Sequence, residues 1–89
     1  MSSNVVWALK IRGDVHKQLS KLPNPDQSRL IEVIETLPDN PYAGDIEKLR
    51  GLENAWRRRV GAFRIFYQLK VAERILYVYR VKRRTSSTY

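Results

Sequence analysis

The 89-residue chain contains no cysteine, only one histidine, and no apolar run that approaches the roughly 20 residues of a membrane-spanning helix. Without cysteine, the chain has no disulfide framework and no cysteine-based metal site or nucleophile. A single histidine excludes an acid–base mechanism that needs a histidine pair. The N-terminus lacks the basic, apolar and small-residue pattern of a secretory signal, so we expect a cytoplasmic protein.

Acidic residues are scarce in the second half of the chain. Residues 1–45 hold five Lys/Arg and six Asp/Glu, a net charge of −1, whereas residues 46–89 hold twelve and three, a net charge of +9. Such asymmetry is typical of proteins that bind nucleic acid, an anionic membrane surface or an acidic protein. The positive charge falls on expected strands and a tail, not on an amphipathic helix. Nucleic acid is therefore the favoured partner.

The apolar pattern predicts a single α+β domain over residues 1–89. We expect a strand at 5–11, a helix that opens with Asp14 as its N-cap, and a second helix from Asp26 to about Leu37. A short proline break joins the two helices, which should form an antiparallel hairpin. Three strands at 56–60, 63–70 and 75–82 should form an antiparallel meander. The expected fold is one small sheet with helices on one face.

The stretch from Trp56 to Tyr67, WRRRVGAFRIFY, predicts the central hairpin of this sheet. Gly61-Ala62 suits a type II′ turn, whose first central residue needs a positive φ. The resulting register gives a core face with Trp56, Val60, Phe63, Ile65 and Tyr67, and an outer face with Arg57, Arg59, Arg64 and Phe66. Charge on an outer strand face is usually a solvated surface. Three guanidiniums on one face repel each other, however, and their planar forks match phosphate oxygens.

A set of residues at fixed spacing resembles the RelE/ParE superfamily of toxins from bacterial and archaeal toxin–antitoxin systems. The family pattern is Leu-x-Gly, then an aromatic residue, a basic-x-basic-hydrophobic-Gly motif, and an aromatic-Arg-hydrophobic-x-Tyr motif. This chain matches the pattern through Leu49, Gly51, Trp56, Arg57, Arg59, Val60, Gly61, Phe63, Arg64 and Tyr67. The resemblance covers nearly the whole chain and implies a RelE-like fold.

RelE-like members of this family are endoribonucleases, and the resemblance implies the same activity here. They cleave mRNA in the ribosomal A site without a metal or other cofactor, and so inhibit translation. The substrate's own 2′-hydroxyl attacks the adjacent phosphate, and the 5′-oxygen leaves. The implied partners are mRNA on the ribosome, with contacts to ribosomal RNA, and a cognate antitoxin. Two alternatives remain: a ParE-like inhibitor that poisons DNA gyrase by binding, and an RNA-binding module without chemistry.

Site residues follow from the resemblance, one position at a time. The expected catalytic residues are Arg57, Arg59, Arg64, Arg83 and Tyr89, and the expected additional RNA-binding residues are Lys48, Arg50, Arg58, Lys82 and Arg84. No metal ligand is expected. RelE has lysines at the positions of Arg57 and Arg59, and arginine does not release its proton in proteins. These two arginines should therefore hold the phosphate, which leaves Tyr89 as the candidate general base.

The sequence does not separate Arg83 from Arg84. A simple meander places Arg83 on the outer face but turns Arg80 toward the core. A bulge near Tyr79 and Arg80 would turn Val81 inward and place Arg84 on the outer face. Arg83 is the preferred choice.

The sequence also predicts where the remaining aromatic residues and the histidine lie. Trp7 and Trp56 should pack in the core, and His16 should lie on the surface of the first helix. Phe66, Tyr77 and Tyr79 either stack against nucleotide bases or pack on the sheet.

Overall fold

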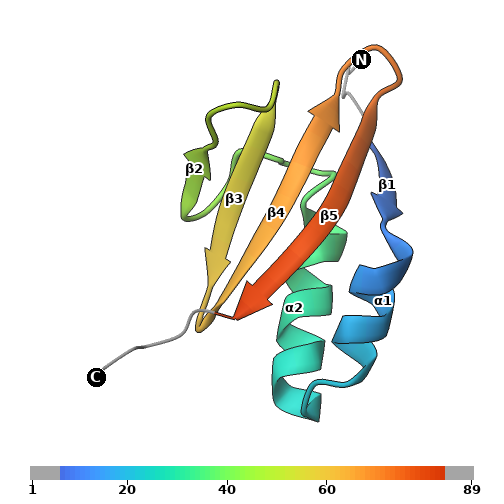
Figure 1. Ribbon diagram of the computed structural model, residues 1–89, viewed down its shortest axis with the longest axis vertical. Coiled ribbons are helices and arrows are strands. Elements are labelled where there is room, and N and C mark those ends of the chain that lie inside the picture. The colour runs from blue at the N-terminus through green and yellow to red at the C-terminus, as the bar shows by residue number, and fades with distance from the viewer. Residues whose placement is uncertain (1–6, 84–89) are drawn as a thin grey trace.

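A computed structural model describes residues 7–83 and shows an open five-stranded sheet with two helices on one side (Figure 1). The elements are β1 (Ala8–Ile11), α1 (Gly13–Ser20), α2 (Asn24–Thr36), β2 (Ile46–Lys48), β3 (Ala55–Val60), β4 (Phe63–Lys70) and β5 (Ile75–Arg83). The strand order is β1-β5-β4-β3-β2, with β1 parallel to β5 and the other pairs antiparallel. The predicted α+β class is confirmed. The short strand β2 was not predicted, and it extends the meander from three strands to four.

The two helices are antiparallel neighbours, as predicted, but both begin differently from the expectation (Figure 1). Asp14 is not the N-cap of α1: that position is Arg12, and Asp14 lies in the first turn with its carboxylate 3.0 Å from the Arg12 guanidinium. Helix α2 begins at Asn24, two residues early, with Pro25 in its first turn. Proline is tolerated there because the first-turn N–H groups have no intrahelical partner.

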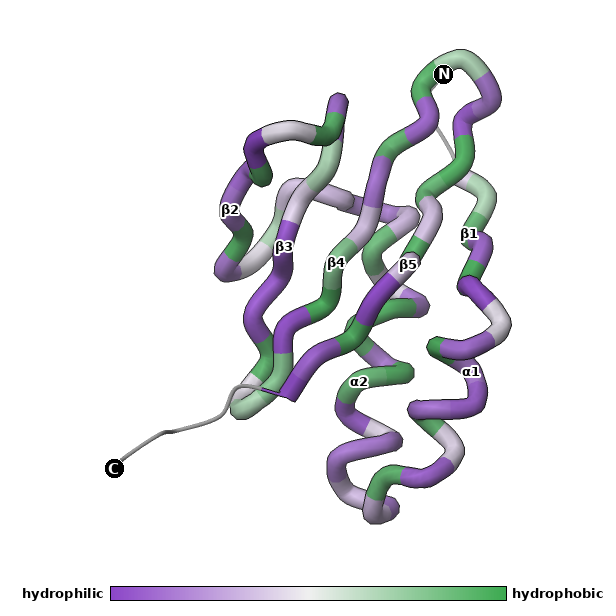
Figure 2. The backbone as a smooth tube through the Cα atoms, in the orientation of Figure 1, coloured by the Kyte–Doolittle hydropathy of each residue, from purple (hydrophilic) through white to green (hydrophobic). Residues whose placement is uncertain are grey.

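The register of the β3–β4 hairpin is the predicted one. Val60 lies opposite Phe63 and Arg59 opposite Arg64, across a turn in which Gly61 has φ +57°. Along β4 every second residue is buried: Phe63, Ile65, Tyr67 and Leu69. Figure 2 shows hydrophilic colour along the middle of β3, where Arg57, Arg58 and Arg59 follow one another, and both hydrophilic and hydrophobic segments along β4.

A β-bulge interrupts the pairing of β4 with β5. Phe66 lies opposite Arg80, whereas Tyr67 lies opposite Val78, so Tyr79 is the extra residue. Val81 is buried and Arg80 is exposed. The simple meander that would have turned Arg80 toward the core is therefore wrong, and the bulged alternative is correct. The bulge keeps apolar side chains on the buried face at both ends of β5.

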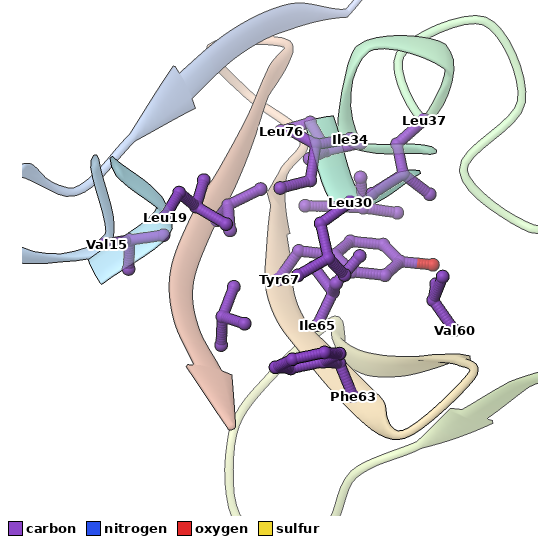
Figure 3. Packing of buried hydrophobic residues seen from close by; sticks show 13 residues of the cluster. Val15, Leu19, Leu30, Ile34, Leu37, Val60, Phe63, Ile65, Tyr67 and Leu76 are labelled. Atoms are coloured by element: carbon purple, nitrogen blue, oxygen red, sulfur yellow. The ribbon is translucent and has the colours of Figure 1, made fainter. Parts of the chain in front are cut away.

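The core lies between the inner sheet face and the two helices, and Tyr67 is its largest fully buried side chain. Figure 3 shows the Tyr67 ring beside Leu30 and Ile65. Its hydroxyl donates a hydrogen bond to the carbonyl of Pro41. Burial raises the pKa of Tyr67 to about 12, which favours the protonated phenol that donates this hydrogen bond. Trp7 and Trp56 pack against this core, as predicted.

The loop before β2 is fastened to the sheet edge by Arg58. The Nη1 atom of Arg58 donates a hydrogen bond of 3.1 Å to the carbonyl of Ala43. Gly44 has φ +83°, and a Cβ atom added there would lie 2.4 Å from the Arg58 Cζ atom.

Neither helix within residues 7–83 has the length and apolar character of a membrane span.

Substitution Gly44→Ala should destabilise the fold, since it combines left-handed backbone strain of about 1–2 kcal/mol with displacement of Arg58. Gly13→Ala is the matched control: a Cβ atom there meets nothing within 4 Å, at a helical position that favours alanine. Urea unfolding of both variants measures the difference. A Gly44→Ala protein as stable as the Gly13→Ala protein would contradict the close approach of Arg58 to this loop.

Candidate nucleic-acid interface

The outer face of the sheet is the face opposite the helices, and it carries most of the basic side chains of the strands. Strand alternation and the bulge assign its members. They include Glu47, Arg57, Arg59, Arg64, Phe66, Gln68, Lys70, Tyr77, Tyr79, Arg80 and Lys82, with Lys10 opposite Tyr77. Arg57, Arg59 and Arg64 thus share one face, as the hairpin register predicted.

Two carboxylates from the β2 edge lie against the arginines of β3. Glu47 lies opposite Arg57 and forms an ion pair with its guanidinium. The Asp45 carboxylate is 3.9 Å from the Nε atom of Arg59, and the Asp45 carbonyl accepts a 2.9 Å hydrogen bond from the Arg59 backbone N–H. The sequence analysis did not identify these acids, because their position depends on pairing of the short strand β2 with β3.

Arg64 is the centre of a row of three cations. It lies opposite Arg59 on one side and opposite Lys82 on the other, so three neighbouring strands each contribute one positive charge. Within residues 7–83, no ion pair involves Arg64 or Lys82. Like charges directly opposite each other are destabilising. This arginine row, Arg59, Arg64 and Lys82, is therefore a surface that an anion would stabilise.

Two guanidiniums of the row also have unused hydrogen-bond donors. The Nε atoms of Arg59 and Arg64 are shielded from solvent, and neither donates a hydrogen bond to the protein. At 3.9 Å, the Arg59–Asp45 contact is an ion pair but is longer than a hydrogen bond. An unsatisfied buried donor costs about 1–3 kcal/mol, more when it is charged. Arg58 Nε, on the core-facing side, is unsatisfied in the same way, so it is the row of like charges and not these shielded donors that favours an anion here.

Arg83 does not belong to the outer face. It lies opposite Phe63, and its guanidinium carbon is 5.6 Å from the centroid of the Phe63 ring, on the core-facing side of the sheet. The bulge at Tyr79 is the reason, since it shifts the alternation of β5 by one residue. The register that favoured Arg83 over Arg84 is thus corrected. Arg84 and Tyr89 lie outside the described residues.

The remaining predicted RNA-binding residues are dispersed. Lys48 lies opposite Trp56, so it belongs to the core-facing side at the exposed β2 edge. Arg50 is exposed in the loop after β2. Arg58 turns to the core-facing side, where it holds the Ala43 loop. Among the members of this group that the structure describes, only Lys82 lies beside Arg64. His16 is exposed on α1, as predicted, on the helical side of the molecule.

Comparison with known proteins identifies the family. The family model described as "ParE toxin of type II toxin-antitoxin system, parDE" matches residues 5–87. The chain belongs to the RelE/ParE superfamily of type II toxins. A relative from Methanocaldococcus jannaschii, named as toxin RelE1, is 32% identical over 83 residues, which cover 85% of this chain and 92% of the relative.

Solved structures of RelE proteins share the fold. The archaeal RelE–RelB complex from Pyrococcus horikoshii aligns with a TM-score of 0.79 and 25% identity, over 92% of this chain and 99% of that one. The isolated RelE toxin of E. coli aligns with a TM-score of 0.78 and 19% identity, over 91% of this chain and 87% of that one. This toxin is therefore RelE-like in fold over the described residues.

Removing the acidic partners should strengthen anion binding. Asp45→Asn and Glu47→Gln free Arg59 and Arg57 from exposed ion pairs, each worth about 0.2–1 kcal/mol, so affinity for single-stranded RNA should rise up to about fivefold per substitution at low salt. Fluorescence anisotropy with labelled RNA measures the change. Glu53→Gln, in a loop away from the row, is the charge-matched control. Equal gains in all three variants would show that net charge alone governs binding.

Proposed function

We propose that this toxin is a ribosome-dependent endoribonuclease that cleaves mRNA in the A site and thereby inhibits translation. The observation that carries the proposal is the arginine row, three like charges on neighbouring strands, with no ion pair on Arg64 or Lys82 within the described residues. Phosphate satisfies that arrangement, because its oxygens accept several charge-assisted hydrogen bonds from guanidinium groups. The RelE-named relative and the shared fold support the same activity.

The proposed chemistry is an intramolecular transfer within the RNA. The 2′-hydroxyl oxygen attacks the adjacent phosphorus, and its proton passes to a base. The bond from phosphorus to the 5′-oxygen breaks as that oxygen takes up a proton, which leaves a 2′,3′-cyclic phosphate on one fragment and a 5′-hydroxyl on the other. Negative charge accumulates on the phosphate oxygens in the transition state. Arg59 and Arg64 hold these oxygens from neighbouring strands, with Arg57 beside them, so the positive charge is already in position when it is needed.

The arginines on the outer face supply no general base. Guanidinium groups keep their proton in proteins, and the buried phenol of Tyr67, with its pKa of about 12, is bonded to Pro41 on the other side of the sheet. Tyr89 remains the proposed base. A phenol beside several guanidiniums would have a lowered pKa, because the cations favour the phenolate. A base of this kind contributes about 10²–10⁴ in rate.

A ParE-like inhibitor of DNA gyrase is the second candidate, and the matching family model favours it by its description. The two functions make different demands on the outer face. A nuclease needs the arginine row to contact a scissile phosphate, whereas a binding poison needs only a complementary protein surface. Incubation with translating ribosomes beside a gyrase supercoiling assay separates them, and binding of RNA with neither effect would indicate a module without chemistry.

Arg64→Ala should be the most damaging single change to cleavage. Arg64 lies at the centre of the row and next to the rigid turn, and its loss removes a donor much as the loss of an oxyanion-hole donor does, so cleavage should fall about 10²-fold or more. The side chain is on the outer face, and stability should change by only about ±0.5 kcal/mol. Cleavage on programmed ribosomes and a thermal melt provide the two measurements.

Arg58→Ala is the matched control for this experiment, because Arg58 precedes Arg59 on β3 but faces the other side. The variant should lose stability through the broken hydrogen bond to Ala43, about 0.5–1.5 kcal/mol or more for a charged donor, and should cleave at close to the normal rate. Normal cleavage by the Arg64→Ala protein, together with a folded but inactive Arg58→Ala protein, would show that the outer face of the sheet is not the active surface.

The proposed partners are mRNA on the ribosome and a cognate antitoxin, whose disordered segment folds against the toxin. Expression of the toxin alone should arrest growth, and co-expression of the adjacent antitoxin gene should restore it. The Arg64→Ala protein should be tolerated without the antitoxin. Growth at the normal rate under strong expression of folded wild-type protein would contradict the toxin assignment itself.

A further inference from the structure

Three aromatic side chains form a continuous row on the outer face, beside the arginine row. The Phe66 and Tyr79 ring centroids are 6.3 Å apart, and those of Tyr79 and Tyr77 are 6.4 Å apart. Tyr79 is the extra residue of the β-bulge, so its ring is added between the other two without removing Val81 from the core. Bulges commonly redirect a side chain in this way. We call Phe66, Tyr79 and Tyr77 the aromatic row.

A cation lies over the ring at each end of the aromatic row. The Arg80 guanidinium carbon is 6.0 Å from the Phe66 centroid, and the Lys70 ammonium is 5.1 Å from the Tyr77 centroid. The Tyr77 end of the aromatic row adjoins a hollow of about 400 Å³, which is lined by Lys10, Lys70, Glu73, Ile75 and Tyr77. The Phe66 end adjoins Arg64 and Lys82, because the Phe66–Arg80 pair is two positions along the ladder from the Arg64–Lys82 pair.

This combination of aromatic rings and cations fits a single-stranded nucleic acid better than it fits the other common kinds of partner. Unpaired bases stack on aromatic rings, and the phosphates that link them need cations at the side of the rings. A buried apolar protein contact would be poorly served by a surface with this density of charge. From Arg64 to Lys70 the strand extends about 20 Å at ~3.4 Å per residue, so the surface continues well beyond one phosphate.

We propose that the aromatic row is a stacking platform, which holds unpaired bases of the RNA that continues from the arginine row toward the Lys10–Lys70 hollow. The inference rests on the proposed RNA substrate and adds the positioning residues for it. The rings touch bases, not the reacting phosphate. Their role is to fix the position of the strand and to favour RNA whose bases are free to unstack.

The test uses programmed ribosomes that carry mRNA with 2-aminopurine at one position in or next to the A-site codon, moved one position at a time. The A-site nucleotides are 2′-O-methylated, which blocks the attacking oxygen and leaves the RNA intact. Stacking on a tyrosine ring quenches 2-aminopurine fluorescence. Wild-type toxin should quench at one or more positions. Tyr79→Leu and Tyr77→Leu should abolish quenching at one of them and weaken binding about 5- to 150-fold, the range for one lost stacking contact.

Tyr79→Phe should keep both quenching and affinity, because it keeps the ring. Tyr42→Leu is the matched control, since Tyr42 is exposed but packs edge-on against Trp56 at the other side of the sheet. Melting curves exclude unfolding, and Tyr77→Leu provides an independent second test if Tyr79→Leu does not fold.

Absence of quenching by wild-type toxin, or unchanged quenching by both leucine variants, would overturn the platform. So would leucine variants that keep quenching but no longer bind the antitoxin, because the row would then be a protein contact. Unmodified mRNA is assayed in parallel. Quenching without cleavage would contradict the proposed nuclease activity alone, whereas cleavage without ring-dependent quenching would contradict the platform alone.

Discussion

The register of the β3–β4 hairpin controls which side chains the sheet buries and which it exposes. Side chains alternate between faces, so a slip of one residue would send Ile65 and Tyr67 to solvent and Arg59 and Arg64 into the core. Burial of Tyr67 and its bond to Pro41 hold this register from the inside, and the Gly61 turn holds it from the end. The charge on the outer face is a consequence of this packing.

The bulge at Tyr79 is the second element on which the outer face depends. It lets β5 keep Val78 and Val81 in the core while Arg80 and Lys82 face outward. The same extra residue supplies the middle ring of the aromatic row. One local irregularity thus extends the positive surface across a third strand and places aromatic rings beside it, at the cost of a locally disrupted ladder.

Much of this arrangement follows from the sequence, because it is encoded locally. A glycine turn and strict alternation predicted the Arg57, Arg59 and Arg64 face. The sequence did not decide between a simple and a bulged register for β5, because that choice depends on whether Val81 or Arg80 is better buried against the helices. The β2 strand and the acids Asp45 and Glu47 were not predicted, because a strand of this length has no periodic pattern and acquires its position only by pairing with β3.

The central claim is that RNA phosphate binds at the arginine row. A cryo-EM structure of the wild-type toxin on a programmed ribosome, with 2′-O-methylated mRNA in the A site, tests it most directly. The account predicts a phosphate of the A-site codon within hydrogen-bond distance of the Arg64 and Arg59 guanidiniums, on the sheet face opposite the helices. Messenger RNA lying against α1 and α2, with Arg64 free of phosphate, would contradict it.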